Sequence, residues 1–214
     1  MNTTRAAIFF DEYAEGFDNI YGTSNSLWNR MVNKYFRKCM HIRYEKTMTG
    51  CQPVEGKRVL DIGCGPGRYS VKLAQMGAAH VYGIDFATAM IDLATQRAQR
   101  LGVGDRCFFE QRDFFSIEPD APFDYAIVMG VMDYVADPQA LIDQACHMTT
   151  SRAFFSFPID GGLLSWQRKL RYKKRCDLFM YNREQVQKLF ENAPCKRFDL
   201  ELNDRDFFVT VHRS

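Results

Sequence analysis

Three glycines and an aspartate between residues 59 and 70 carry most of the chemical information in this sequence. The run VLDIGCGPGRYS places Asp61 at the end of an apolar strand and Gly63, Gly65 and Gly67 before a helix. Glycine lets a ligand lie against the backbone of a turn, and it adopts positive φ without strain. The N-terminus of the helix behind the turn offers free N–H groups. The pattern therefore predicts a loop that binds a ligand.

A second acid ends the next expected strand. Asp85 closes the apolar part of the run HVYGIDF, residues 80–86. In a doubly wound sheet, an acid at this position lies beside the first glycine loop and accepts hydrogen bonds from both hydroxyls of a ribose. The loop and the two acids together predict an α/β domain that binds a nucleoside.

The spacing of the glycines discriminates between nucleoside cofactors. The fingerprint of dinucleotide-binding domains is G-x-G-x-x-G/A. Counted from Gly63, the sixth position is Arg68, and its side chain would crowd the close helix–strand contact that the third glycine permits. The run is instead G-x-G-x-G with an acid two residues before it. This spacing argues against a dinucleotide, and so against an oxidoreductase.

The chain resembles the class I methyltransferases that use S-adenosylmethionine. The likeness covers residues 57–157 and rests on four blocks in the same order as in that family. The blocks are DIGCGPG from residue 61, GID at 83–85, QRDF at 111–114 and FDYAIVMGVMDYVADP at 123–138. The resemblance implies a Rossmann-like fold, S-adenosylmethionine as the cofactor and methyl transfer as the reaction.

The resemblance also implies roles for the residues around the methionyl and ribose parts of the cofactor. Asp61 would hold the methionyl ammonium, directly or through water, and Met129 would supply a backbone carbonyl near it. Gly63 and Gly65 would pass beneath the cofactor, and Asp85 would bind the ribose diol. A zwitterionic sulfonium ligand needs such acids for its ammonium and its ribose, and an apolar slot for adenine.

The adenine would lie on the far side of the ribose. The resemblance implies that Phe86 packs on the ring, that Asp113 accepts from the adenine amine, and that Phe114 offers a backbone N–H. Cys64 and Met90 complete the expected cofactor-binding set. We interpret Cys64 as a small filler of the glycine loop rather than a nucleophile, because no histidine is near it in the sequence and nothing indicates a low thiol pKa.

The catalytic residues are unknown from the sequence. Methyl transfer is an in-line displacement, and it needs a general base only if the acceptor must lose a proton. Many members of the family carry Glu-His or Asp-His after the fourth strand, and this sequence has Asp133-Tyr134 there. Tyr134 and His41 are candidates for a base, although a tyrosine of pKa near 10 is a poor base at neutral pH. The alternatives are a pocket wall for Tyr134, a solvated side chain for His41, and an acceptor that ionises easily or needs positioning alone.

Two segments outside these blocks are rich in basic residues. A helix is predicted at 25–49, where six basic residues stand against one acid, and segment 158–181 has six against two. We expect both to cover the acceptor and to favour an anionic one, and segment 158–181 is also suited to peripheral contact with an anionic membrane surface. The alternative is that both are solvated charged surfaces. The run FDEYAEGFDNIYGTSN, from residue 10, is similar to the N-terminal cap of the magnesium-protoporphyrin O-methyltransferases.

Strands alternate with helices from residue 57 onward, which predicts a parallel sheet covered on both faces. The runs 196–202 and 205–212 are separated by two residues, Asn203 and Asp204, which predicts a hairpin and an antiparallel last strand. We therefore expect a doubly wound, seven-stranded α/β core at 51–214, a helical cap at 1–50, and 158–181 as a substrate-side insertion.

Composition excludes several classes of protein. The 28 Lys and Arg nearly balance the 26 Asp and Glu, so a chain-wide polyanion binder is not expected and a small-molecule acceptor is favoured over nucleic acid. Seven cysteines without a C-x-x-C pair predict neither a disulfide framework nor a metal site, and suggest the cytoplasm. An RNA or protein acceptor, and a non-catalytic module that binds S-adenosylmethionine, remain the alternative functions.

Overall fold

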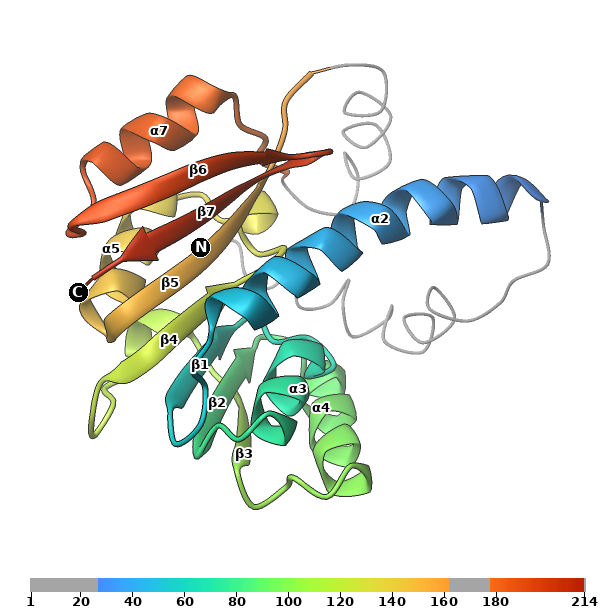
Figure 1. The fold of residues 1–214 in the computed structure, drawn as a ribbon, viewed down its shortest axis with the longest axis vertical. Coiled ribbons are helices and arrows are strands. Elements are labelled where there is room, and N and C mark those ends of the chain that lie inside the picture. The colour runs from blue at the N-terminus through green and yellow to red at the C-terminus, as the bar shows by residue number, and fades with distance from the viewer. Residues whose placement is uncertain (1–26, 162–177, 214) are drawn as a thin grey trace.

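Seven apolar runs form one sheet in the order β3-β2-β1-β4-β5-β7-β6 (Figure 1). The computed structural model describes the backbone of residues 27–161 and 178–213, and the side chains from residue 38 onward within these ranges. The strands are β1 (Arg58–Ile62), β2 (His80–Asp85), β3 (Cys107–Gln111), β4 (Phe123–Val128), β5 (Thr149–Pro158), β6 (Arg197–Asn203) and β7 (Asp206–His212).

The strand directions confirm the predicted topology. The pairs among β1 to β5 are parallel, and β7 runs antiparallel to both β5 and β6. The hairpin turn lies one residue later than the sequence suggested, at Asp204 and Arg205, because Asn203 still pairs with Asp206. Asp204 has φ of 55°, a left-handed conformation that aspartate tolerates in hairpin turns.

Helices cover both faces of the sheet. They are α2 (Leu27–Gly50), α3 (Arg68–Gln75), α4 (Thr88–Arg100), α5 (Pro138–His147) and α7 (Arg183–Glu191), with 3-10 turns η1 (Phe114–Ser116) and η2 (Met132–Tyr134). Their starts follow from local sequence: the Asp137 side chain accepts from the Ala140 N–H ahead of Pro138, and Asn182 forms a capping box with Gln185. Strand β3 ends at Gln111, and the Asp113 side chain caps η1 by accepting from the Phe115 N–H.

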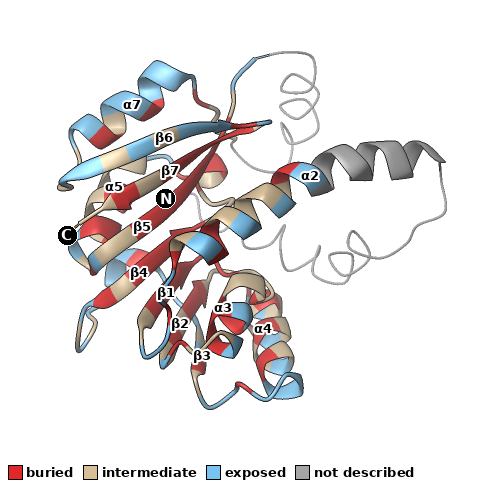
Figure 2. Cartoon of the chain, in the orientation of Figure 1, coloured by how far each residue is buried: buried red, intermediate tan, exposed pale blue. Residues whose placement is uncertain are grey.

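The core lies in two layers, one on each face of the sheet. The layer under α2, α3 and α4 includes Val59, Leu73, Phe154 and Phe208. The layer under α5 and α7 includes Phe123, Phe155, Phe157 and Phe190. Phe154 and Phe155 are successive residues of β5 that fall in opposite layers, as alternation along a strand requires. The interior strands are buried while β6 forms an exposed edge (Figure 2).

The second half of α2 is bonded to the core. Cys39 Sγ donates to Asp206 Oδ2 at 3.0 Å, and Arg43 Nε lies 3.2 Å from the same oxygen. Lys46 Nζ donates to Glu201 Oε2 at 2.8 Å. Helix α2 therefore rests on the β6–β7 hairpin from the far end of the chain. Residues 1–26 of the expected cap at 1–50 and residues 162–177 of the expected insertion lie outside the described part.

Gly83 of β2 gives a test of the packing beneath the glycine loop. A Cβ built on Gly83 would lie 2.6 Å from Phe109 Cδ1 and 3.2 Å from Cys64 Cβ. We expect Gly83→Ala to lower the free energy of unfolding by about 1–3 kcal/mol through overpacking, measured by urea denaturation. Gly104→Ala is the control, because its Cβ would meet nothing closer than 3.5 Å; it should change stability by less than about 0.5 kcal/mol. Equal stability of the two variants would contradict the tight contact.

Candidate functional site

The carboxyl ends of β1, β2, β3 and β4 bring most of the predicted site residues to one edge of the sheet. Asp61 is in register with Gly83 on β2 and with Ile127 on β4. Asp85 ends β2 in register with Gln111 on β3. Met129 lies two residues after Ile127, and Asp113 lies two residues after Gln111. Ligands of open α/β sheets bind in the crevice outside this edge.

The three glycines of the loop serve different purposes. A Cβ built on Gly63 would lie 2.4 Å from Val131 Cγ2, and one on Gly67 would lie 2.9 Å from Ala94 Cβ, so packing excludes side chains there. Gly65 has φ of +52° and no atom within 4 Å of such a Cβ. The loop therefore presents open backbone at Gly65, the cradle that a bound ligand requires.

Asp85 closes the loop from the side of β2. One of its carboxylate oxygens, Oδ2, accepts from the Gly65 N–H at 2.9 Å, and the other, Oδ1, accepts from the Ala87 N–H at 3.0 Å. These bonds fix the plane of the carboxylate at the edge of the cradle. A carboxylate has about four acceptor positions, so Asp85 can accept from a diol while it keeps both backbone bonds.

Asp61 is a buried carboxylate, with 2% of the residue exposed. Its Oδ2 accepts from the N–H and the hydroxyl of Ser70, in the first turn of α3. Burial, with a smaller effect from the nearby Asp85, raises the pKa of Asp61 to about 7 against the lowering effect of the Ser70 hydrogen bonds. A cationic ligand group beside Asp61 would favour its ionised form.

The predicted adenine-side residues differ in exposure. Phe86 is half-buried and Asp113 is exposed, with Asp113 Oδ1 accepting from the Phe115 N–H at 3.1 Å. Phe114 is buried in the core layer under α5, so its side chain belongs to the core. Met90 is buried beside Ala87 in a small cluster at the start of α4.

Cys64 is buried within the glycine loop. Its N–H donates to the Ile84 carbonyl at 2.9 Å, which ties the loop to β2. Burial raises the pKa of the Cys64 thiol, and Asp61 and Asp85 raise it further. A thiol in this state is a poor nucleophile, which supports the interpretation of Cys64 as a filler.

The segment after β4 borders the loop from the other side. Met129 is half-buried at the end of β4, and Gly130 follows with φ of +73°. Tyr134 is half-buried in η2, with its N–H bonded to the Val131 carbonyl, while Asp133 before it is buried. The sequence predicted Tyr134 in this segment. It did not predict that Val131 packs against Gly63 of the glycine loop.

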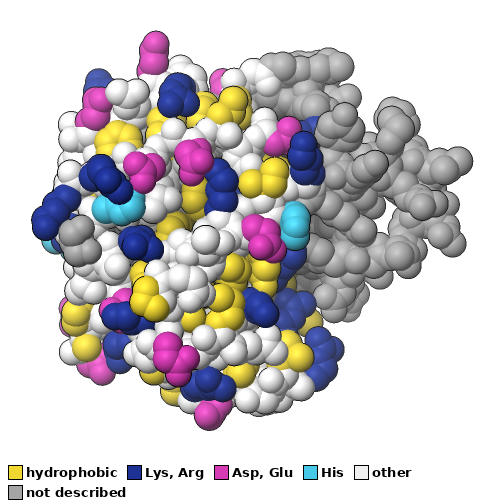
Figure 3. All heavy atoms as spheres, viewed as in Figure 1, with side chains coloured by type: hydrophobic (Ala, Val, Ile, Leu, Met, Phe, Trp, Pro, Cys, Tyr) yellow, Lys and Arg dark blue, Asp and Glu magenta, His cyan; other side chains and the backbone are white. Residues whose placement is uncertain are grey.

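His41 lies on the exposed side of α2. The side chain of His41 is 67% exposed, with Nδ1 3.9 Å from Glu45 Oε1, whereas Cys39 and Arg43 occupy the buried side of α2. On the described part of the face in Figure 3, Lys and Arg side chains are interspersed with Asp and Glu. Most basic residues of the two segments 25–49 and 158–181 fall outside the described side chains, namely Arg30, Lys34, Arg37 and the basic residues of 168–175.

Two further observations concern the described residues only. They contain no group of three histidine, cysteine or acidic side chains close enough to hold a metal ion. None of their helices is long and apolar enough to cross a membrane.

Sequence reasoning missed two polar residues that support the site. Ser70 binds Asp61, and Ser156 lies buried in β5 beside Gly130. A signal for Ser156 exists, since it is the one hydroxyl in the apolar run FFSFP. No comparable signal marks Ser70, because serine is ordinary in the first turn of a helix.

The sheet order and the glycine loop at the carboxyl ends of β1 and β2 define a Rossmann-like domain. The chain belongs to the methyltransferase-domain family, whose model matches residues 53–199, and its fold is that of the class I S-adenosylmethionine-dependent methyltransferases. The sequence-based identification of the family is thereby confirmed.

Curated relatives match part of the chain. The ubiquinone biosynthesis O-methyltransferase of Xylella fastidiosa strain 9a5c is 36% identical over 96 residues, which cover 45% of this chain and 39% of that protein. The 27-O-demethylrifamycin SV methyltransferase of Amycolatopsis mediterranei strain S699 is 27% identical over 147 residues, covering 64% and 54%. The chain thus spans about half or less of the length of these relatives.

A solved structure matches the whole chain. Magnesium protoporphyrin IX methyltransferase from Synechocystis PCC 6803, with bound S-adenosylhomocysteine, has a TM-score of 0.74 at 22% identity and covers 100% of both chains. This likeness shows the fold.

Gly65 allows the cradle to be tested with a matched control. Gly65 and Gly102 both have positive φ, +52° and +70°, and neither has an atom within 4 Å of a built Cβ. Alanine at either position should cost about 1 kcal/mol of folding free energy through backbone strain. Gly65→Ala alone should weaken binding of S-adenosylhomocysteine, by about tenfold or more, because its methyl group enters the ligand space. Calorimetry that finds equal affinity for the two variants would contradict a ligand at Gly65.

The raised pKa of Asp61 predicts pH-dependent binding. Below pH 7 the carboxyl carries a proton that it must lose to pair with the ligand ammonium. The affinity for S-adenosylhomocysteine should therefore rise about tenfold between pH 6 and pH 8, with most of the rise below pH 7. The Asp61→Asn variant should bind more weakly and lose this dependence. An unchanged pH profile in Asp61→Asn would show that another group titrates.

Proposed function

We propose that this protein transfers a methyl group from S-adenosylmethionine to a small or medium-sized acceptor. The observation that carries the proposal is the open backbone at Gly65, flanked by the carboxylates of Asp61 and Asp85 at neighbouring strand ends. These residues fit the cofactor, because its ribose diol needs an acceptor and its ammonium needs an acid. Family membership over residues 53–199 supports the same reaction.

The residues present would act mainly by binding and orientation. S-adenosylmethionine supplies an electrophilic methyl group on a sulfonium. Asp85 would accept from the ribose hydroxyls, Asp61 would pair with the ammonium, and Phe86 with Asp113 would bind the adenine. Positioning of two reactants and exclusion of water can account for several kcal/mol of the barrier. Tyr134 is the candidate base that lies at this edge, and an acceptor that ionises easily needs none.

The acceptor we propose is a small anionic molecule methylated on oxygen. The names of the relatives support a small molecule and an oxygen, since they act in ubiquinone biosynthesis and on a rifamycin. The excess of basic residues in 25–49 and 158–181 supports an anion. We propose that both segments cover the acceptor as a cap and an insertion on the core. The six cysteines in the described part are free thiols, which supports a reducing, cytoplasmic location.

The experiment that tests the function measures binding first and turnover second. Wild-type protein should bind S-adenosylhomocysteine and not NAD. Asp85→Ala should weaken that binding by about 1–3 kcal/mol, because the ribose loses a charged acceptor. Asp92→Ala, an exposed acid on α4, is the matched control and should bind as wild type does.

Turnover separates an enzyme from a binding module. With S-adenosylmethionine and a panel of phenols and carboxylic acids, S-adenosylhomocysteine should form only when an acceptor is present. Binding without turnover on any small acceptor, RNA or protein would favour the non-catalytic module. Failure of the wild type to bind would refute the proposed function.

A further inference from the structure

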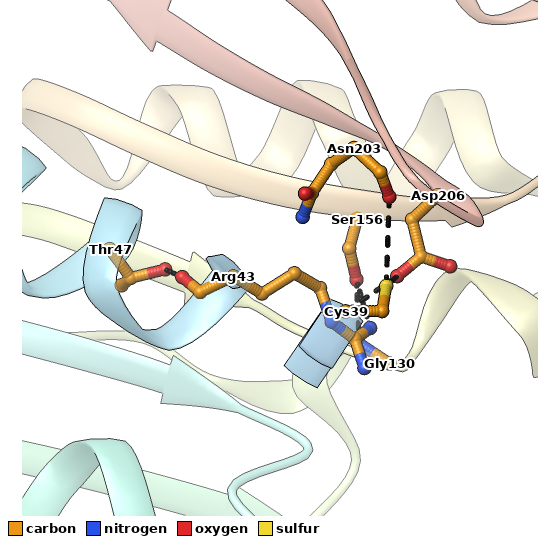
Figure 4. Close-up of polar contacts among 7 residues, drawn as sticks. All are labelled: Cys39, Arg43, Thr47, Gly130, Ser156, Asn203 and Asp206. Atoms are coloured by element: carbon orange, nitrogen blue, oxygen red, sulfur yellow. Dashed lines mark hydrogen bonds and ion pairs between the residues drawn. The ribbon is translucent and has the colours of Figure 1, made fainter. Parts of the chain in front are cut away.

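A buried polar cluster joins α2 to β5, to the β6–β7 hairpin and to the segment after β4 (Figure 4). Its centre is Arg43, whose side chain is 16% exposed. Arg43 Nε lies 3.2 Å from Asp206 Oδ2, and Nη1 donates to Ser156 Oγ at 3.1 Å. Burial is the largest single effect and opposes the guanidinium charge, but Asp206, Tyr69, Cys39 and Asp133 together outweigh it and raise the pKa of Arg43. Arg43 therefore stays charged.

Ser156 connects this cluster to the backbone after β4. Its residue is 1% exposed, and its hydroxyl oxygen accepts both from Arg43 Nη1 and from the Gly130 N–H, the latter at 2.9 Å. A hydroxyl oxygen has two acceptor positions, so these two donors use both. Loss of the hydroxyl would leave two partly buried donors without this acceptor.

Gly130 is connected to the glycine loop through the next residue, Val131. A Cβ built on Gly130 would lie 3.9 Å from Arg43 Nη1, so the guanidinium faces this turn directly. The next residue, Val131, packs so closely on Gly63 that no side chain fits between them. Hydrogen bonds and contacts thus run without a break from α2 through Ser156 and Val131 to the loop.

The sheet order says which end of the cofactor meets this segment. Strand β1 lies between β2 and β4. A ligand with its ribose at Asp85, beyond β2, and its chain over the end of β1 extends toward β4. Its amino acid end then reaches the side where Met129, Gly130 and Val131 lie, while its adenine points away toward β3.

We propose that Ser156 and Arg43 are positioning residues, which hold the segment 129–131 against the methionyl end of S-adenosylmethionine. The inference rests on the proposed function, and it assigns these residues no contact with the adenosine part. It also makes the seating of α2 a condition for the shape of the methionyl subsite, because Arg43 belongs to that helix.

Two ligands that differ only at the methionyl end test the proposal by calorimetry. S-adenosylhomocysteine carries the amino acid chain, whereas 5′-methylthioadenosine lacks it. In Ser156→Ala, the dissociation constant for S-adenosylhomocysteine should rise roughly tenfold, as expected for misplaced polar partners. The constant for methylthioadenosine should change less than about twofold. Arg43→Lys keeps a charge beside Asp206 but lacks the second arm to Ser156, and should show the same selective loss.

The control is Thr149→Ala, which removes another buried hydroxyl from β5 at the opposite end of the strand. It should lose a comparable amount of thermal stability and bind both ligands as wild type does. If Ser156→Ala weakens both ligands equally, or neither, the positioning role is wrong and Ser156 is structural only. If wild-type protein binds neither ligand, the proposed function fails as well, and the two failures are distinguishable.

Discussion

A carboxylate buried at the end of β1 is the constraint on which the site depends. Asp61 stands almost out of solvent, one residue from the turn that opens the glycine loop, and its oxygen is held by both polar groups of Ser70. Taking an ionised carboxylate out of water is unfavourable unless a positive partner compensates. A cation bound beside Asp61 would therefore stabilise the ionised form of this buried carboxylate. In the function proposed above, that positive partner is the ammonium of the methionyl group.

The glycine loop is shaped by its neighbours as much as by its ligand. Val131 excludes a side chain at Gly63, and Ala94 with Phe109 excludes one at Gly67. Gly65, between them, is left facing open space, and the Asp85 carboxylate binds its N–H. Close packing at Gly63 and Gly67 therefore holds Gly65 in a conformation that a cofactor can approach. The segment after β4 contributes to the site in the same way, through packing behind the loop.

The sequence predicted those parts of the molecule that are encoded locally. Strand β1, the loop and β2 follow from apolar runs, glycine spacing and the acids that end each strand, so Asp61, Gly65 and Asp85 could be named in advance. The hairpin could be predicted from the two residues between its runs. The cluster around Arg43 could not, because its members come from positions 39–43, 130, 156 and 203–206. Contacts across such distances leave no periodic trace. The same reason explains why the second role of Gly63 was not predicted. The sequence assigned Gly63 to the cofactor alone, whereas the structure also packs Val131 against it.

The docking of α2 on the β6–β7 hairpin constrains the order in which the elements of the chain can fold. Cys39 meets Asp206 across 167 residues, and Lys46 meets Glu201 across 155. Strand β7 also stands between β5 and β6 in the sheet, so neither β5 nor β6 has its full set of neighbours before β7 arrives. During synthesis, the face of α2 that carries Cys39 and Lys46 therefore stays uncovered until residues 201–206 have left the ribosome. Contacts of such high sequence separation slow folding, and the interval exposes the N-terminal part to chaperones and proteases before its partner strands exist.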